Sequence, residues 1–123
     1  MRINIKGTGM EITSAIGDYL NKKLEHINKF VDPADESALC DVELGKTTKH
    51  HNKGDLFRAE INLHIKGKNL RAVSETEDLY ASIDEVKDEM TRELLSSKDR
   101  KVSLIKRGGA KIKNVLKGIF TNE

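Results

Sequence analysis

Four side chains of this sequence are of the types that bind transition metals. His50, His51, His64 and Cys40 supply imidazole and thiolate groups, which together are common zinc ligands. Their spacing matches no known ligand pattern, and the His50-His51 pair lies in a polar stretch that we expect to be a mobile loop. The sequence therefore favours a solvated basic loop over a metal site, and we expect neither a metal nor any other cofactor.

A carboxylate pair and a glycine pair are the remaining candidates for chemistry. Asp41 and Glu43 are two residues apart in a predicted strand, so both point to one face, as acid–base catalysis could require. Strand alternation demands polar residues there in any case, and no nucleophile or companion histidine falls in register. Gly7-Thr8-Gly9 lacks the third glycine and the Lys-Ser/Thr pair of phosphate loops, which indicates a turn. We predict that the protein is not an enzyme and has no small-molecule substrate.

Length and composition limit what the chain can build. Its 123 residues suffice for one domain with a modest core plus a tail. Charged residues make up 34% and aromatic residues 4%, so the core must be aliphatic. A single cysteine excludes an internal disulfide. No apolar run reaches the length of a membrane span and no secretory signal opens the sequence, so we expect a cytoplasmic protein without a membrane partner.

The charge distribution is uneven. Residues 98–123 carry eight Lys or Arg side chains and two acidic ones, a net charge of +6. The first 97 residues carry 14 basic and 18 acidic side chains, a net charge of −4. An acidic body with a basic end indicates an anionic partner that is reached mainly by that end and by local patches.

The first half of the chain predicts a strand and a helix. Arg2–Lys6 alternates, with Ile3 and Ile5 on one face, which is typical of a half-buried strand. Thr13 is the expected cap of a helix that runs to about Val31. Apolar residues recur along one stripe of this helix at Ile12, Ile16, Tyr19, Leu20, Leu24, Ile27 and Phe30, while three lysines lie off it at Lys22, Lys23 and Lys29. These lysines are typical of a solvated helix face.

Three further strands and a second helix follow. Two runs alternate cleanly between apolar and polar residues, at 38–44 and 57–65, and a glycine-bounded polar stretch, 45–54, is predicted to be a long mobile hairpin connection. A tight turn at Gly67-Lys68 leads into a strand at Leu70–Ser74. Thr76 is the expected cap of a long helix with an apolar stripe at Leu79, Ile83, Val86, Met90 and Leu94. The order β-α-β-β-β-α predicts an α+β two-layer sandwich with two helices on one face of a four-stranded sheet.

Two segments carry a resemblance to a known family. The opening GTGMEITSAIGDYLNKKL and the later stretch LRAVSETEDLYASIDEVKDEMTREL resemble the ribosome hibernation-promoting factor and ribosome-associated inhibitor family, in its short form. Gly7–Ile16 matches the first motif of the family. Arg71-Ala72, Thr76–Asp84 and Met90–Leu94 match the second. The resemblance covers about residues 1–101 and implies a fold similar to double-stranded-RNA-binding domains.

The family resemblance also implies a function. Its members occupy the decoding channel of the small ribosomal subunit, contact its 16S-type rRNA, and block messenger and tRNA binding in idle or stressed cells. We accordingly predict a ribosome-binding domain at 1–101, a basic tail at 102–123, and a protein that is monomeric when free. The implied rRNA-binding residues are Lys22, Lys23, Lys29, Arg71, Arg92, Lys98, Arg100 and Lys101. For the three lysines of the first helix, rRNA contact and a solvated face both stay open.

Some features depart from the family pattern. Glu89 stands where the family often has lysine, and Glu85 and Asp88 make that helix face more acidic. We therefore expect rRNA binding to depend more on Arg92 and the basic residues after it than on the whole length of the helix. Residues 102–123 are interpreted either as a solubilising tail or as a tail that orders on rRNA. A general duplex-RNA-binding module, and docking of a basic amphipathic stretch at 109–120 on a membrane or protein, are the rival hypotheses.

Overall fold

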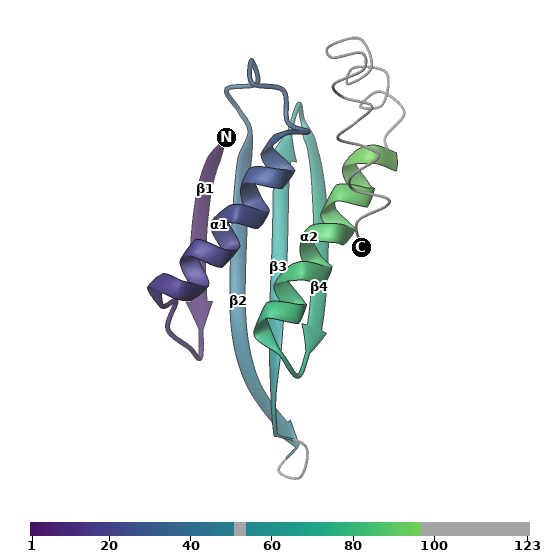
Figure 1. The fold of residues 1–123 in the computed structure, drawn as a ribbon. Coiled ribbons are helices and arrows are strands. Elements are labelled where there is room, and N and C mark those ends of the chain that lie inside the picture. The colour runs from purple at the N-terminus through teal and green to yellow at the C-terminus, as the bar shows by residue number, and fades with distance from the viewer. Residues whose placement is uncertain (51–53, 97–123) are drawn as a thin grey trace. The chain divides into compact units, whose positions relative to one another are not determined.

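The computed structural model describes residues 1–50 and 54–96 of the chain. Met1–Thr91 forms one compact unit, and a second begins at Arg92, where the described residues comprise the last turn of a helix. The elements follow the predicted order, which is confirmed (Figure 1): β1 (Arg2–Thr8), α1 (Ser14–Asn28), β2 (Leu39–His50), β3 (Gly54–Ile65), β4 (Lys68–Thr76) and α2 (Leu79–Ser96). The predicted boundary after Lys101 lies outside the described residues.

The four strands form one mixed sheet in the order β1-β2-β3-β4. β1 pairs with β2 in parallel, with Ile3 opposite Cys40 and Ile5 opposite Val42. β2, β3 and β4 are antiparallel neighbours. A parallel pair needs a crossover connection, and α1 provides it between β1 and β2.

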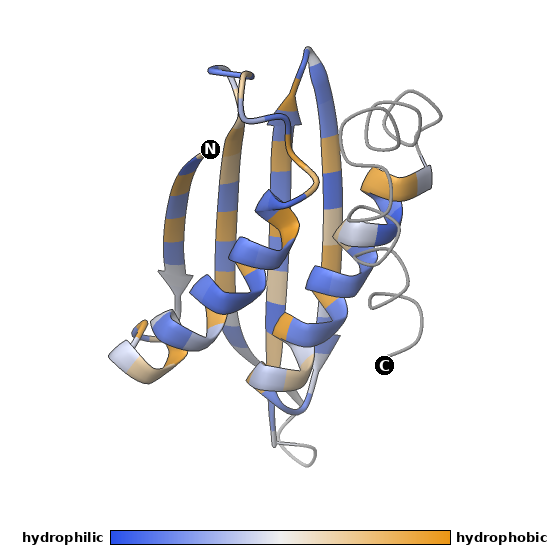
Figure 2. Ribbon diagram, turned by 45° about the horizontal axis from the view of Figure 1, so that its top comes forward, coloured by the Kyte–Doolittle hydropathy of each residue, from blue (hydrophilic) through white to orange (hydrophobic). Residues whose placement is uncertain are grey.

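Both helices cover the same face of the sheet, as predicted, and the core lies between the two layers (Figure 1). Alternate residues of the two central strands face the helices, and the apolar stripe of each helix faces the sheet. The residues that are almost wholly buried include Leu20, Leu24, Ile27, Cys40, Leu44, Ile61, Leu63, Ile83, Val86 and Met90. Figure 2 shows the corresponding alternation of apolar and polar bands along the strands. The other sheet face is polar, so the sheet has one dry and one wet side.

The first helix is capped as predicted but is shorter. The Thr13 hydroxyl accepts a hydrogen bond from the Ile16 amide at 3.2 Å, which satisfies one of the free amides of the helix start. α1 ends at Asn28, before the predicted end near Val31. The amides of Phe30 and Val31 bond to carbonyls three residues earlier, so the chain tightens into a turn while both side chains stay buried.

The prediction that Thr76 caps the second helix is wrong. Thr76 is the last residue of β4, and the helix starts at Leu79 with the carboxylate of Asp78 accepting from the Tyr80 amide at 3.2 Å. The Thr76 hydroxyl accepts from the Asp78 amide at 3.1 Å instead. Thr76 therefore ties the turn between β4 and α2, and the acidic residue two positions later is the cap, because its side chain reaches the first free amides.

The hairpin predictions also need correction. The polar stretch 45–54 is largely strand: β2 continues to His50 and β3 begins at Gly54, with a register shift between Thr47 and His50. Cross-strand contacts hold this arm, since Asp55 accepts from Thr48 at 2.8 Å and pairs with Lys46 at 3.2 Å. In the second hairpin the turn residues are Lys66 and Gly67, both with positive φ, which suits a type I′ turn.

The strands at the edges of the sheet are longer than predicted. β1 extends to Thr8 and β4 spans Lys68–Thr76 rather than Leu70–Ser74. Ile3 and Ile5 lie on the helix-covered side, as predicted, yet 41% and 37% of their surfaces are exposed, because β1 is an edge strand. Of the helices among the described residues, none is long and apolar enough to cross a membrane.

Candidate nucleic-acid interface

The outward face of α1 alternates in charge. Asp18, Lys22 and Glu25 of α1, and Lys29, the residue that caps its C-terminal end, recur at helical spacing and are all exposed. The side chains of Lys22 and Lys29 have no ion-pair or hydrogen-bond partner in the described part of the chain, so their ammonium groups are available to an external anion. The structure thus places two of the three predicted α1 lysines where they can reach a phosphate.

Lys23 has a different environment, in the seam between the two helices. Its ammonium pairs with Asp84 of α2 at 3.1 Å and lies 5.0 Å from the ring centroid of Tyr19. The Tyr19 hydroxyl donates to Asp84 at 2.6 Å, and its ring meets that of Tyr80 edge to face, with centroids 4.8 Å apart. This group, which we call the helix clasp, joins α1 to α2.

Titration in the helix clasp follows from these contacts. Hydrogen bonding to Asp84, burial and the negative charge of Asp84 raise the pKa of Tyr19. Burial on its own would lower the pKa of Lys23, but its hydrogen bond to Asp84 and the charge of that carboxylate outweigh burial, and the pKa is raised. Lys23 therefore stays cationic and is committed to an internal pair.

His26 and Lys87 continue the seam beyond the helix clasp. The Nε2 atom of His26 is buried without a hydrogen-bond partner among the described residues, and the ring lies 6.1 Å from that of Phe30. Burial lowers the pKa of His26, and the nearby charges of Lys87, Lys29 and Lys23 lower it further, against a smaller opposing effect of Asp88. Lys87 is a basic residue of this region that the sequence did not single out as a binding residue.

The lowered pKa of His26 predicts a pH-dependent stability. Below its ordinary pKa of 6.5 the unfolded chain takes up a proton at His26 more readily than the folded chain does. The stability that neutral, buried His26 contributes to the folded state is therefore present above a pH of about 6.5. It is lost as the pH falls from there through the lowered pKa of the folded state. Urea unfolding between pH of about 7.5 and 5.5 should show the decline, and His26→Gln should flatten it. The control is His64→Gln, a substitution on the wet face of the sheet. An equal flattening of the pH dependence in this variant would contradict its assignment to His26.

Arg71 lies on the wet face of the sheet, away from the helices. Its guanidinium pairs with Glu60 at 3.3 Å. Glu60 also accepts from Asn62 at 2.7 Å and pairs with Arg58. Hydrogen bonds from Asn62, Arg71 and Arg58 lower the pKa of Glu60 to about 2, against the opposing effect of burial. Arg71 and the α1 lysines therefore point to opposite sides of the molecule and cannot form one contiguous patch.

The residues predicted near the end of the domain are only partly placed. Arg92 is exposed in the last turn of α2. Lys98, Arg100 and Lys101 lie outside the described residues, as does the whole predicted tail at 102–123. The rRNA contacts of all eight predicted residues stay predictions.

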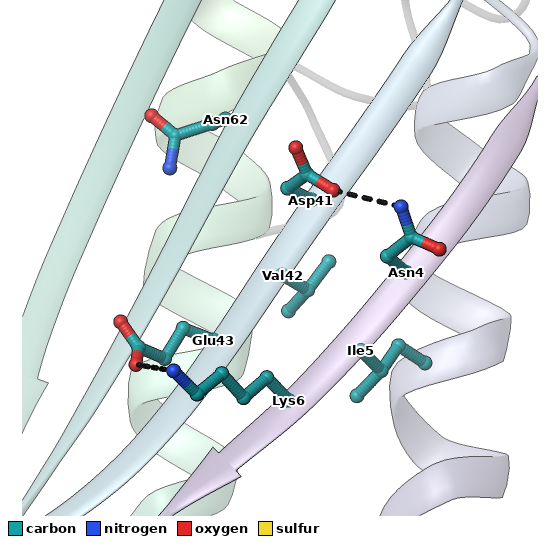
Figure 3. A pocket seen from close by; sticks show the side chains of 7 residues that line it. All are labelled: Asn4, Ile5, Lys6, Asp41, Val42, Glu43 and Asn62. Atoms are coloured by element: carbon teal, nitrogen blue, oxygen red, sulfur yellow. Dashed lines mark hydrogen bonds and ion pairs between the residues drawn. The ribbon is translucent and has the colours of Figure 1, made fainter.

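The fold accounts for Cys40, His64 and the carboxylate pair, while the His50-His51 pair is not tested, because the side chain of His50 and the whole of His51 lie outside the described residues. Cys40 is buried in the core, where burial and the adjacent Asp41 raise the pKa of its thiol to about 12, while His64 is on the wet face. Over residues 1–50 and 54–96, no three His, Cys, Asp or Glu side chains lie close enough to hold a metal ion. On the wet face, Asp41 accepts from Asn4 at 3.0 Å and Glu43 pairs with Lys6 at 4.0 Å, beside a hollow that Asn62 also lines (Figure 3). Glu43 also accepts from Thr8 at 2.7 Å. Both carboxylates thus belong to cross-strand pairs.

Comparison with known proteins decides the family. The family model described as sigma 54 modulation protein / S30EA ribosomal protein matches residues 3–102. The chain belongs to this family. It is a family of ribosome-associated proteins and not one of enzymes.

Relatives within the S30EA family cover most of the chain. A ribosome hibernation promoting factor of Klebsiella oxytoca is 31% identical over 100 residues, which are 81% of this chain and 96% of the relative. One of Pseudomonas putida is 30% identical over 112 residues, 90% of this chain and 100% of the relative.

Solved structures agree with the fold. The N-terminal domain of Thermus thermophilus protein Y is 34% identical with a TM-score of 0.64, covering 76% of this chain and 96% of that one. A ribosomal subunit interface protein from Coxiella burnetii has a TM-score of 0.62 at 20% identity, covering 78% of this chain and 96% of that one, and shows the fold alone.

Proposed function

We propose that this protein is a ribosome hibernation factor that binds the small ribosomal subunit in the decoding channel and blocks messenger and tRNA binding. The proposal rests on one observation above all, the alignment of 90% of this chain with a complete hibernation promoting factor of Pseudomonas putida. Its partner is 16S-type rRNA, its location is the cytoplasm, and the free protein is a monomer.

The surface chemistry supports binding to the RNA backbone rather than to bases. Lys22 in α1 and Lys29 at its C-terminal cap offer unpaired ammonium groups along one stripe, and charged groups of this kind contact phosphates. Aromatic residues are 4% of the chain, and Tyr19 is held in the helix clasp, so stacking on unpaired bases has few platforms. A rigid two-layer domain with such a surface recognises the shape of folded RNA and obstructs a channel by occupying it.

The helix clasp gives the interface its rigidity. Lys23 and Tyr19 of α1 both contact Asp84 of α2 and so hold the two helices together. The outward lysines are thereby presented at a fixed angle, which lowers the conformational entropy lost on binding. Lys23 contributes in this account as a positioning residue, and Lys22 and Lys29 as the contacting residues.

Sedimentation with separated ribosomal subunits tests the proposal. The protein is expected to travel with the small subunit at one copy per particle and to abolish binding of initiator tRNA to that particle. A free RNA duplex of about 16 base pairs is the comparison, because duplex-binding domains span that length. Equal affinity for the free duplex and for the small subunit, or unimpaired tRNA binding at saturation, would contradict the proposal and favour a general duplex-RNA-binding module.

A further inference from the structure

β1 is an open edge of the sheet with apolar side chains beside it. Among the described strands it has one neighbour, β2, so the backbone groups along its outer side lack a strand partner. Ile3 and Ile5 are 41% and 37% exposed, although they face the helix layer. An open edge flanked by exposed isoleucines favours pairing with another strand unless the protein guards it.

A groove runs along this edge between β1 and α1. It has a volume of about 240 Å³, with Met1, Ile3 and Leu24 on its apolar side and Asn21, Glu25 and Asn28 on its polar side. Such a groove can accept the alternate side chains of an added strand.

The charges on β1 define the partner. On the wet side of the strand, Arg2 has no side-chain partner in the described part of the chain, and the side chain of Lys6 is 76% exposed and 4.0 Å from Glu43. The segment Arg2–Thr8 contains no acidic residue. β4, the opposite edge, differs, because it carries both Arg71 and Glu75, and Ser74 bonds to Glu85 of α2.

We propose that the β1 edge binds an extended segment of a partner protein in which apolar residues alternate with acidic ones. The segment adds a fifth strand beside β1, its apolar side chains cover Ile3 and Ile5, and its carboxylates meet Arg2 and Lys6. A second copy of this chain fits less well, since pairing two β1 strands would bring two Arg2 and two Lys6 side chains together while neither of the paired strands carries an acidic residue. RNA would satisfy the cations but leave the isoleucines uncovered.

A synthetic peptide tests this surface directly. The probe is a blocked nine-residue peptide of glutamate alternating with valine, and its matched control has lysine in place of glutamate. With isotope-labelled full-length protein, the glutamate peptide is expected to slow amide exchange in residues 2–8 and to leave β4 unchanged. The lysine peptide is expected to bind at least about tenfold more weakly, since two cross-strand ion pairs become repulsive.

Charge reversal completes the test. The double variant Arg2→Glu/Lys6→Glu should reverse the preference in favour of the lysine peptide by about the same factor. Lys68→Glu, at the start of β4, makes a charge reversal on the other edge and should leave the preference unchanged. Three results would overturn the proposal: equal binding of both peptides, equal protection of β4, or exchange in β1 that is already slow without peptide and depends on protein concentration. The last would assign the edge to a second copy.

Discussion

Replacing both Lys22 and Lys29 with glutamate is expected to weaken small-subunit binding by about 100-fold, or ~2.7 kcal/mol. The effect is large because the stripe they share already carries Asp18 and Glu25. In the natural chain the charges alternate, so the lysines can reach phosphates past their acidic neighbours. In the double variant the whole stripe is acidic and faces the phosphate backbone, and like-charge juxtaposition of this kind costs several kcal/mol.

The salt dependence of binding shows whether these lysines touch phosphates. Each lost phosphate contact should reduce the slope of log affinity against log salt by about 0.7 to 0.9 units. The double variant should therefore lose about 1.4 to 1.8 units of slope in binding titrations from low to moderate salt. Lys68→Glu is the control, because it reverses one lysine charge at the far edge of the sheet and should leave the slope unchanged.

A separate variant distinguishes contact from positioning. Lys23→Gln removes a cation that is paired with Asp84, and it is expected to lower the melting temperature while leaving the salt slope nearly unchanged. An unchanged affinity of the Lys22→Glu/Lys29→Glu variant, together with a strong loss in Lys68→Glu, would move the interface from α1 to the sheet.

The fold was predictable where the hydrophobic period was clean. The alternation of Val42 and Leu44 with Asp41 and Glu43 correctly predicted which face of β2 is buried. The apolar stripe from Leu79 to Leu94 likewise predicted the buried face of α2. Element ends were less predictable because they depend on contacts between distant residues. The arm at 45–50 looks like a loop in composition, but its pairing with β3 supplies partners for Thr48 and Lys46 that composition does not reveal.

The candidate site was predictable in residue types and less so in geometry. The family motif pointed to Lys22, Lys23 and Lys29 together, but whether a lysine is free or paired depends on what faces it across the helix seam. Asp84 is 61 residues from Lys23 in the chain, and no local pattern links them. Arg71 differs, because strand alternation in the sequence already places it on the wet face, although the family motif groups it with the helix residues.

The Ser82→Ala substitution is expected to destabilise the fold by about 3 kcal/mol, a large effect for removing one oxygen. Ser82 is fully buried at the start of α2, and its hydroxyl donates to the Phe57 carbonyl at 2.7 Å and accepts from the Thr76 amide at 3.1 Å. It therefore joins β3, the end of β4 and α2. Removing the hydroxyl leaves two backbone groups without their partner in a place that water reaches poorly, and each such group costs about 1–3 kcal/mol.

Urea unfolding of Ser82→Ala measures this cost, with Ser37→Ala as the control. Ser37 also uses its hydroxyl for a hydrogen bond, to Asp35 at 2.5 Å, but it is exposed and water can replace the bond. The control should therefore change the free energy of unfolding by less than about 0.5 kcal/mol. Ser82→Cys keeps a weak donor of similar size, so its loss of unfolding free energy should lie between those of Ser82→Ala and Ser37→Ala. If Ser82→Ala is as mild as the control, the Thr76 hydroxyl, 2.8 Å from the Ser82 hydroxyl, has taken over the bond to the Phe57 carbonyl, and the double variant with Thr76→Val should then restore the loss.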